Sequence, residues 1–208
     1  MKNKILITGS VGFIGFSLAK SFLESGYNVI GIDNINNYYS RKIKLDRLKI
    51  LKKFKKFEFF KIDLRNNNKL VLSLKKYKID IVYHLAAQAG VRHSINHPED
   101  YVSNNLVGFF NIMNFSRINR IKHFIFASTS SVYGLNVKLP YSELDPVNHP
   151  SQFYAATKRS NELMAHSYSC IYNLKCTGVR FFTVYGPWGR PDMALFKFVK
   201  NIINRKPI

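Results

Sequence analysis

The feature that most constrains the fold is a set of three glycines that follows the first short apolar run of the chain. Lys4–Thr8 predicts a strand, and Phe13–Glu24 predicts a helix in which apolar side chains recur every four residues. Between the two, Gly9, Gly12 and Gly15 give the spacing G-x-x-G-x-x-G. Glycines permit a tight turn and a close approach of backbone to a ligand, and the helix N-terminus that follows favours negative charge. The pattern therefore predicts a turn that holds a pyrophosphate group.

The remainder of the chain alternates short apolar strands with amphipathic helices, the order expected of a parallel sheet covered by helices on both faces. Further strands are predicted over residues 28–32, 57–62, 79–84, 123–127 and Cys176–Phe181, and further helices over 101–117, Phe153–Tyr172 and 193–204. No internal repeat or low-complexity linker interrupts this order. We therefore predict a doubly wound α/β fold of the Rossmann type, with residues 1–208 forming one domain.

The formal net charge of +20 raises the question of whether the chain binds an anionic macromolecule. Its lysines are dispersed, and the densest run, 42–61, interleaves with Leu45, Leu48 and Leu51. That spacing predicts a helix with one buried apolar stripe and a solvated basic face. Nucleic-acid binding is therefore not expected as the main function, although the positive surface would weakly favour an anionic substrate.

The sequence indicates neither a membrane segment nor a metal site. No stretch is long and apolar enough to span a membrane, and glycines interrupt the N-terminal apolar run that faintly resembles a signal peptide. Cys170 and Cys176 fit neither a disulfide framework nor a metal-ligand spacing. His93 and His97 stand four residues apart, but Pro98 follows directly, so a zinc site is not expected. We expect a cytoplasmic protein that neither enters a membrane nor binds a metal.

A carboxylate after the second predicted strand extends the glycine pattern towards a dinucleotide site. Asp33 stands 18 residues after Gly15, where it can accept hydrogen bonds from both hydroxyls of an adenosine ribose. An acid there repels a 2′-phosphate, so NAD is favoured over NADP. Asp63, just after the third predicted strand, is placed to border the adenine. The alternative is that both acids are ordinary turn residues at strand ends.

A second group of polar residues has the spacing of a proton-transfer site. Tyr154 and Lys158 form Y-x-x-x-K on a predicted helix, where four-residue spacing puts both side chains on one face. A free tyrosine has a pKa of about 10, and a lysine cation together with a positive nicotinamide ring is expected to lower the pKa of Tyr154. Four hydroxyl residues, 128–131, follow the fifth predicted strand, where ligands gather in a doubly wound sheet. Each feature alone is common, but their joint order favours a catalytic site.

These residues together resemble the extended short-chain dehydrogenase/reductase superfamily. A closer likeness, to the UDP-glucuronate 4-epimerase family, covers essentially the whole chain and is carried by residues 33–39 (DNINNYY), 85–92 (LAAQAGVR), 154–164 and 180–193 (RFFTVYGPWGRPDM). The resemblance implies an NAD-dependent isomerase that interconverts UDP-glucuronate and UDP-galacturonate through a transient 4-keto sugar. It also implies a UDP-sugar as the binding partner, and a homodimer formed through the helices around Tyr101 and Tyr154.

The resemblance assigns roles to individual residues as well. It implies that Thr129, Tyr154 and Lys158 are catalytic, with Tyr154 as the base. The residues implied to contact NAD are Gly9, Gly12, Phe13, Ile14, Gly15, Asp33, Asn34, Asp63, Leu64, Leu85, Ala86, Ala87, Gln88, Asn105, Ser128, Tyr154, Lys158 and Phe181. The residues implied to bind the sugar or its carboxylate are Arg92, Thr129, Ser130, Ser131, Tyr154, Thr183 and Arg190. The separate roles of the two arginines stay open.

Other activities compete with this one. A 4-epimerase acting on neutral UDP-glucose is disfavoured by the arginine-containing segment 188–193. A 4,6-dehydratase is disfavoured by Ser130 and Ser131, which stand where an acidic pair is expected. A decarboxylase acting on UDP-glucuronate would share the first oxidation. An alternative of another class is an inactive NAD-binding remnant, which the intact catalytic residues oppose.

The chain departs from the family pattern in two residues and in length. Val11 replaces a usual alanine between the glycines, which is tolerable where its side chain points away from the pyrophosphate. Asn148 replaces a usual aspartate. Family members continue beyond this chain with a last strand and most of the uridine-binding lobe. We therefore expect the C-terminal substrate lobe to be largely missing, and a sheet edge with apolar surface to be exposed.

Overall fold

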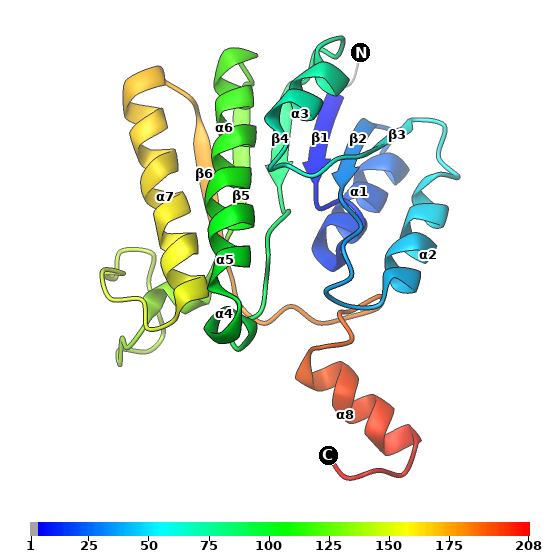
Figure 1. Ribbon diagram of the computed structural model, residues 1–208, viewed down its shortest axis with the longest axis vertical. Coiled ribbons are helices and arrows are strands. Elements are labelled where there is room, and N and C mark those ends of the chain that lie inside the picture. Colours follow the sequence, from blue (N-terminus) through cyan, green and yellow to red (C-terminus); the bar gives the residue numbers. More distant parts are fainter. Residues whose placement is uncertain (1–3) are drawn as a thin grey trace.

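The computed structural model describes residues 4–208, and its centre is a six-stranded parallel sheet (Figure 1). The strands are β1 (Lys4–Thr8), β2 (Asn28–Asp33), β3 (Phe57–Lys61), β4 (Ile81–His84), β5 (His123–Thr129) and β6 (Cys176–Phe181). They lie in the order β3-β2-β1-β4-β5-β6, and every neighbouring pair is parallel. The order reverses between β1 and β4, which is the topology of a doubly wound sheet and confirms the predicted fold class.

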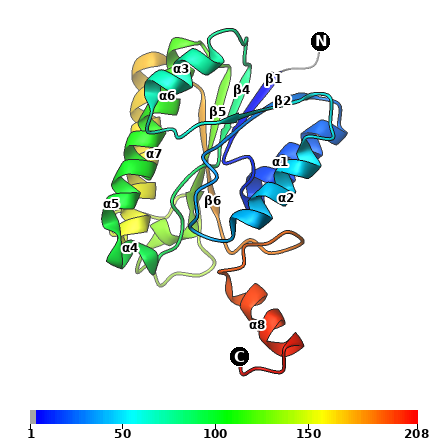
Figure 2. The ribbon, with the colours of Figure 1, turned by 45° about the vertical axis from the view of Figure 1, so that its right-hand side comes forward.

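Helices cover both faces of the sheet, as the crossover connections of parallel strands require. Figure 2 shows α1 and α2 on one side and α3, α6 and α7 on the other. The helices are α1 (Phe13–Glu24), α2 (Arg41–Leu51), α3 (Asn67–Leu74), α4 (His93–Asn96), α5 (Pro98–Tyr101), α6 (Gly108–Ile118), α7 (Phe153–Tyr172) and α8 (Ala194–Ile203). A π-helical turn, η1 (Val102–Val107), precedes α6, and a 3-10 turn, η2 (Ser130–Tyr133), follows β5.

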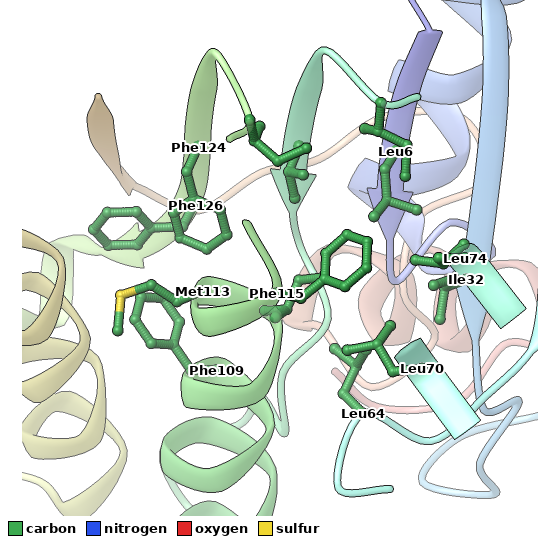
Figure 3. Close-up of a cluster of buried hydrophobic side chains, with 14 of the residues drawn as sticks. Leu6, Ile32, Leu64, Leu70, Leu74, Phe109, Met113, Phe115, Phe124 and Phe126 are labelled. Carbon is green, nitrogen blue, oxygen red and sulfur yellow. The ribbon is translucent and has the colours of Figure 1, made fainter. Parts of the chain in front are cut away.

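The central strands are apolar on both faces because both faces are covered. In β1, Leu6 packs in the layer under α3, α6 and α7, whereas Ile5 and Ile7 pack against α1. Figure 3 shows the first of these layers, in which the ring centroids of Phe109 and Phe124 lie 5.7 Å apart. Replacing one such phenylalanine by alanine costs about 3–5 kcal/mol of stability. The two layers therefore fix the sheet and hold the carboxyl ends of its strands at one edge.

The predicted helix within 42–61 is wrong in its length and in its buried face. α2 is shorter, and Leu45 is 47% exposed rather than buried. The buried face consists of Lys44, Arg47, Leu48 and Leu51, which are the i, i+3, i+4 and i+7 positions of a helix. The positions of the apolar residues alone predicted the wrong buried face, because two cations on this helix are buried with polar partners from other segments.

The predicted helix over 101–117 is interrupted. α5 begins at Pro98, and the π-helical turn η1 separates α5 from α6. A π turn holds one more residue than an α turn and is common at functional sites. Within this turn, Asn105 is buried. The helix α3 lies outside the predicted elements; its N-cap is Asn66, whose side chain accepts a hydrogen bond from the Lys69 N–H at 2.9 Å.

The other predicted elements are confirmed, with ends that differ by a few residues. β5 runs on to Thr129, so Ser128 and Thr129 belong to the strand, and only Ser130 and Ser131 belong to the turn that follows. α7 and β6 have the predicted bounds. The hydroxyl cluster therefore starts inside the sheet and ends in the first turn beyond it.

The segment after β6 lies apart from the layers on the sheet. Figures 1 and 2 show α8 as a separate arm beyond the sheet, and none of its residues is buried. β6 is an edge strand with β5 as its neighbour. The expected sheet edge and exposed apolar surface are thus present. Within residues 4–208, no helix has the length and apolar character needed to cross a membrane.

Candidate active site

The glycine turn between β1 and α1 is packed so closely that side chains would not fit at two of its positions. Gly9 has a φ of +69°, and a Cβ there would lie 2.8 Å from the backbone nitrogen of Ala86. A Cβ on Gly15 would lie 2.1 Å from the carbonyl oxygen of Gly9. Gly12 is the N-cap of α1, and no side chain caps the first N–H groups of that helix. An uncapped helix N-terminus behind a tight turn is suited to bind a pyrophosphate.

Asp33 stands at the end of β2 and faces the same turn. Its carboxylate accepts hydrogen bonds from the N–H of Ile35 at 2.8 Å and from the N–H of Val11 at 3.3 Å. Burial raises the pKa of Asp33, while these N–H donors and the cations of Lys44 and Arg47 act to lower it. The side chain of Val11 is buried against Ile35 and does not line the cavity beside the turn. This is the condition under which a valine is tolerable between the glycines.

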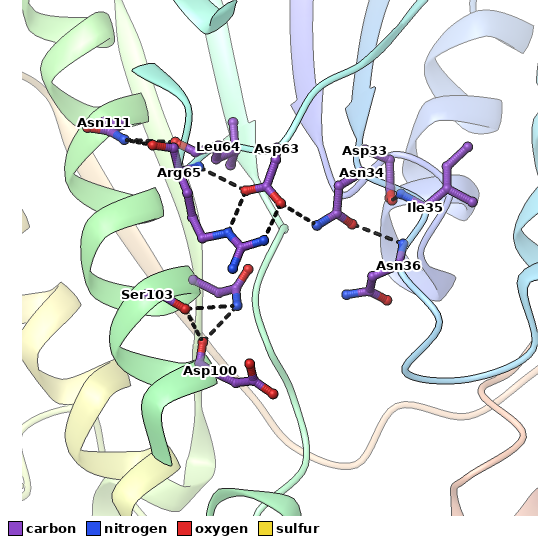
Figure 4. Close-up of polar contacts among 11 residues, drawn as sticks. Asp33, Asn34, Ile35, Asn36, Asp63, Leu64, Arg65, Asp100, Ser103 and Asn111 are labelled. Carbon is purple, nitrogen blue, oxygen red and sulfur yellow. Dashed lines mark hydrogen bonds and ion pairs between the residues drawn. The ribbon is translucent and has the colours of Figure 1, made fainter. Parts of the chain in front are cut away.

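The second acid, Asp63, is tied to its neighbours in the loop after β3 (Figure 4). Arg65 donates to both of its carboxylate oxygens, from Nε at 2.9 Å and from Nη2 at 2.8 Å. The Asn34 amide donates to it at 3.1 Å. The hydrogen bonds from the Arg65 side chain are the main reason that the pKa of Asp63 falls to about 2. The loops after β2 and β3 therefore form one connected wall.

A cavity of about 850 Å³ at the carboxyl ends of the strands joins these residues to the predicted catalytic group. The predicted NAD contacts that line it are Gly9, Gly12, Phe13, Ile14, Gly15, Asp33, Asn34, Asp63, Leu64, Leu85, Ala86, Ala87, Gln88, Ser128, Tyr154, Lys158 and Phe181. The predicted sugar contacts Arg92, Thr129, Ser130, Ser131, Thr183 and Arg190 also line it. All predicted site residues but one thus share one cavity.

Asn105 is the exception, because it lies behind the cavity wall rather than on it. Its Oδ1 accepts a hydrogen bond from the Gln88 N–H at 2.8 Å, and its Nδ2 donates to the Gln88 carbonyl and to Thr157 Oγ1, both at 3.1 Å. Its amide is therefore engaged with protein groups on both sides. The NAD contact of Asn105 stays a prediction, and in this structure Asn105 positions the backbone of Gln88, which does line the cavity.

The three predicted catalytic residues come from the end of β5 and the first turns of α7. Thr129 is the last residue of β5, Tyr154 is the second residue of α7, and Lys158 lies one turn further along. The Thr129 hydroxyl lies near enough to the Tyr154 phenol to act on its pKa, and it donates a hydrogen bond to Ser131 Oγ at 3.3 Å. Thr129 Oγ1 also accepts a hydrogen bond from the Ser131 N–H at 3.2 Å and so caps η2. The hydroxyl that meets the tyrosine is therefore fixed by the turn that follows it.

Burial dominates the titration of the tyrosine and the lysine. It raises the pKa of the Tyr154 phenol, against which the Thr129 hydrogen bond and the Arg190 cation act. It lowers the pKa of the Lys158 ammonium to about 8, although the Glu162 carboxylate favours the charged form. The expected lowering of the Tyr154 pKa by Lys158 and a nicotinamide ring together stays a prediction; in this structure Arg190 is the cation that acts on the phenol. A fully enclosed ammonium is itself costly to charge.

Ser128 is held by an ionic cluster on its outer side. Its hydroxyl donates to Glu162 Oε1 at 2.6 Å. Glu162 also pairs with Arg180 at 3.0 Å and with Arg159 at 2.9 Å. Burial acts to raise the pKa of Glu162, but hydrogen bonds from Arg180 and Ser128 bring it below its usual value. The cluster ties β5, β6 and α7 together directly behind the hydroxyl residues.

Two arginines, Arg92 and Arg190, line the cavity. The Arg190 guanidinium pairs with Asp192 and lies 5.8 Å from the ring centroid of Tyr38. Arg92 precedes α4 as its N-cap residue and lines the cavity too. Tyr38, Lys44 and Asp192 line the cavity without having been predicted as site residues. The available signal was that two of them, Tyr38 and Asp192, lie in the segments that carry the family resemblance.

Known proteins resemble this chain in sequence over nearly its whole length. Residues 5–208 match the NAD dependent epimerase/dehydratase family. The chain is 55% identical over 205 residues to Protein CapI of Staphylococcus aureus, and the match covers 99% of this chain and 61% of that protein.

Solved structures show the same fold with different sugars. The UDP-glucuronic acid 4-epimerase from Bacillus cereus, in complex with UDP-glucuronic acid and NAD, has a TM-score of 0.88 at 36% identity, over 98% of this chain and 64% of its own. The UDP-glucose 4-epimerase from Thermotoga maritima, with UDP-glucose, has a TM-score of 0.89 at 28% identity, over 99% of this chain and 64% of its own. The chain spans less than two thirds of the length of these relatives. Because the family match extends over nearly the whole sequence, the chain belongs to the NAD-dependent epimerase/dehydratase family.

Proposed function

We propose that the chain is the NAD-binding, catalytic part of a nucleotide-sugar 4-epimerase, and that its substrates are UDP-glucuronate and UDP-galacturonate. The observation that carries the proposal is the gathering of Thr129, Tyr154 and Arg190 around the cavity that also contains the glycine turn. A hydroxyl–phenol pair suits removal of a proton from a sugar hydroxyl. A guanidinium in the same cavity suits a sugar that carries a carboxylate.

The residues present fit NAD. A Cβ built on Gly12 meets only the carbonyl group of Gly9, at 3.0 Å from its oxygen, so the turn is open on its outer side. In this proposal the pyrophosphate lies at the uncapped N-terminus of α1, and the adenosine ribose lies at Asp33 with the adenine near Asp63. When bound, NAD would take up the hydride that leaves the sugar as its 4-hydroxyl becomes a ketone and would give the same hydride back in the reduction.

The protein groups supply the proton transfer and the orientation. Tyr154 removes the proton of the sugar 4-hydroxyl, and the hydroxyl of Thr129 holds that oxygen against the phenol. Because burial raises the pKa of Tyr154, the phenolate depends on the Thr129 hydrogen bond and on the positive charge of Arg190. The same phenol returns the proton when the ketone is reduced on its other face, which inverts the carbon. Lys158, one turn along α7, presents its ammonium on the same helix face.

Arg190 supports a uronic acid as the substrate. A uronic acid differs from the neutral sugar by a carboxylate, and a guanidinium has five N–H donors, more than Asp192 alone can use. The Arg190 bonds to Asp192 come from Nε and one terminal nitrogen. Ser130, Ser131 and Thr183 add hydroxyls to the same cavity. The rival substrate is UDP-glucose, which has no carboxylate, so that Arg190 would form only its ion pair with Asp192.

Proton NMR of the sugar tests the proposal. The NAD-loaded chain is incubated with UDP-glucuronate and, separately, with UDP-glucose. Formation of UDP-galacturonate without net NADH is expected, and preferential conversion of UDP-glucose would overturn the choice of substrate. Because the relatives are longer, the same assay is run on the chain joined to the C-terminal part of such a relative. An inactive fusion that still binds NAD would favour the remnant instead.

Tyr154→Phe tests the assignment of the base. Turnover should fall by about 10²–10⁴-fold, while NAD affinity stays close to that of the unchanged protein, because the ring is kept and only the ionisable oxygen is lost. Tyr141→Phe is the matched control, since Tyr141 stacks on Tyr133 outside the cavity and should keep full activity. Near-normal turnover by Tyr154→Phe would show that another group is the base.

A further inference from the structure

Arg47 is a fully buried cation whose hydrogen bonds in the described part of the chain all go to neutral oxygens. Its Nη1 donates to the carbonyl of Val11 at 2.9 Å and to the hydroxyl of Tyr39 at 2.8 Å. Its Nη2 donates to the carbonyls of Trp188 and Gly189. Its Nε has no hydrogen-bond partner in residues 4–208. One side chain on α2 therefore joins the glycine turn, the loop after β2 and a turn near the end of the chain.

The turn that Arg47 reaches has an unusual backbone. The N–H of Gly189 donates to the carbonyl of Gly186 at 3.1 Å, which closes a four-residue turn with Pro187 in the second position. Trp188, in the third position, has a φ of +62°, a region that glycine or asparagine normally occupies in such turns. A bulky residue stays there only where its surroundings hold it, and such strain gathers at functional sites. Here Phe16 meets the Trp188 ring edge-on at 5.7 Å.

We propose that Arg47 is a positioning residue that fixes the Gly186–Gly189 turn to the glycine turn, and thereby places Arg190 in the sugar end of the cavity. Arg190 comes directly after the turn, so the position of the two carbonyls bound by Arg47 sets where its guanidinium stands. The role of Arg190 as the carboxylate contact rests on the proposed function. The hold of Arg47 on the turn does not.

A comparison within α2 shows why this position needs arginine. Lys44 lies three residues earlier on the same buried face, and its ammonium donates to the carbonyl and the side-chain oxygen of Asn36. Its hydrogen bonds therefore go to one residue of one loop, and its ammonium lies 4.5 Å from the ring centroid of Tyr39 in the same loop. The guanidinium of Arg47 is a planar fork with donors in several directions and is more weakly hydrated than an ammonium, so it can bridge three segments while buried. A lysine at position 47 keeps the charge but cannot make all these bonds.

Trp188 is the single tryptophan of the chain, so its fluorescence reports on the turn alone. Time-resolved anisotropy is the suitable measurement because the ring is already 43% exposed, and the proposal concerns its mobility rather than its exposure. In the unchanged protein the decay should follow overall tumbling. In Arg47→Lys a fast nanosecond component should appear, since released loops move on that timescale. Lys49→Met, which removes an exposed cation from the same helix, is the matched control and should show no such component.

Two further variants keep the result decisive. Tyr39→Phe removes one partner of Arg47 without touching the turn and should give a smaller change in the same direction. Phe16→Leu tests whether the ring contact alone holds Trp188. The proposal is overturned if Arg47→Lys and Tyr39→Phe, folded by circular dichroism, leave the anisotropy decay unchanged, or if Phe16→Leu alone introduces the fast component.

A binding measurement links the turn to the sugar. The measurement uses the NAD-loaded protein joined to a relative's C-terminal part. There, Arg47→Lys should lower the affinity for UDP-glucuronate by about tenfold, because one charge-assisted contact is lost, and should lower the affinity for UDP-glucose much less. Equal weakening of both sugars would remove the link to Arg190. If the unchanged protein does not distinguish the two sugars, the proposed substrate is wrong, while the anisotropy experiment still decides the role of Arg47.

Discussion

The sheet with its covering helices and the segment after β6, residues 182–208, hold their apolar side chains in opposite ways. In the first region Phe109 and Phe124 are fully enclosed. In the second, Leu195 and Phe198 on α8 stand open, and none of the helix is buried. Both regions contribute to the same cavity. The part of the cavity wall that comes from the sheet region is therefore held by its own core, whereas the part that comes from residues 182–208 depends on a few polar and ring contacts with the first region.

Gly15→Val should produce the largest effect and tests the packed side of this comparison. A Cβ there would meet the carbonyl oxygen of Gly9 at 2.1 Å, so the turn has to open, at a cost of about 4 kcal/mol or more. Loss of NAD binding by calorimetry, with a much lower melting temperature, is expected. Gly186→Val is the control in the second region, where a Cβ meets nothing within 4 Å, although its φ of +139° leaves local strain. Normal NAD affinity in Gly15→Val would contradict the role given to the tight turn.

The free energy of unfolding in urea, measured for Phe109→Ala and for Phe198→Ala, compares the two regions directly. The first should lose about 3–5 kcal/mol, because it leaves a cavity between α6 and the sheet. The second should change stability by less than about 0.5 kcal/mol, since its ring is 47% exposed. Comparable losses in both variants would mean that α8 packs on the protein in solution, which would break the comparison.

The smallest expected effect concerns buried charge. Burial lowers the pKa of Lys158 to about 8 in the folded protein, whereas an unfolded lysine titrates at about 10.4. Between these values the unfolded chain binds more protons, so this group makes the free energy of unfolding rise as pH rises from about 8 to 10. Lys158→Met should remove that contribution, and Lys200→Met on exposed α8 should not. Identical pH profiles for the unchanged protein and Lys158→Met would show that the ammonium is better solvated than the structure has it.

The regular elements were largely predictable because their patterns are local. α7 and β6 have the predicted bounds, and the glycine turn has the predicted place between β1 and α1. Helix periodicity and strand length depend on residues that are close together in the sequence. The gathering of the site residues also followed from topology, since parallel strands bring their carboxyl ends to one edge.

The errors arose where partners come from distant segments. The basic residues of the run 42–61 were expected on a solvated face, yet Arg47 is buried with partners up to 142 positions away in the sequence. The spacing of Tyr154 and Lys158 gave no sign that burial raises the pKa of Tyr154, against which the Thr129 hydroxyl and the Arg190 cation act. The π turn that places the Asn105 amide against Gln88 was likewise not indicated by the sequence. Burial and through-space charge depend on the folded arrangement and leave no periodic signal.

The π turn before α6 has a consequence for insertions and deletions. A π turn holds one residue more than an α turn, so removing one residue from Val102–Val107 would convert it to α-helix while the helices on either side keep their phase. The packing of Phe109 against the sheet would then survive, but Asn105 would lose the widened turn that brings its amide to Gln88. Substitutions at the exposed positions of this helix leave that relation intact. Over evolutionary time, the length of the segment is therefore under stricter constraint than much of its composition.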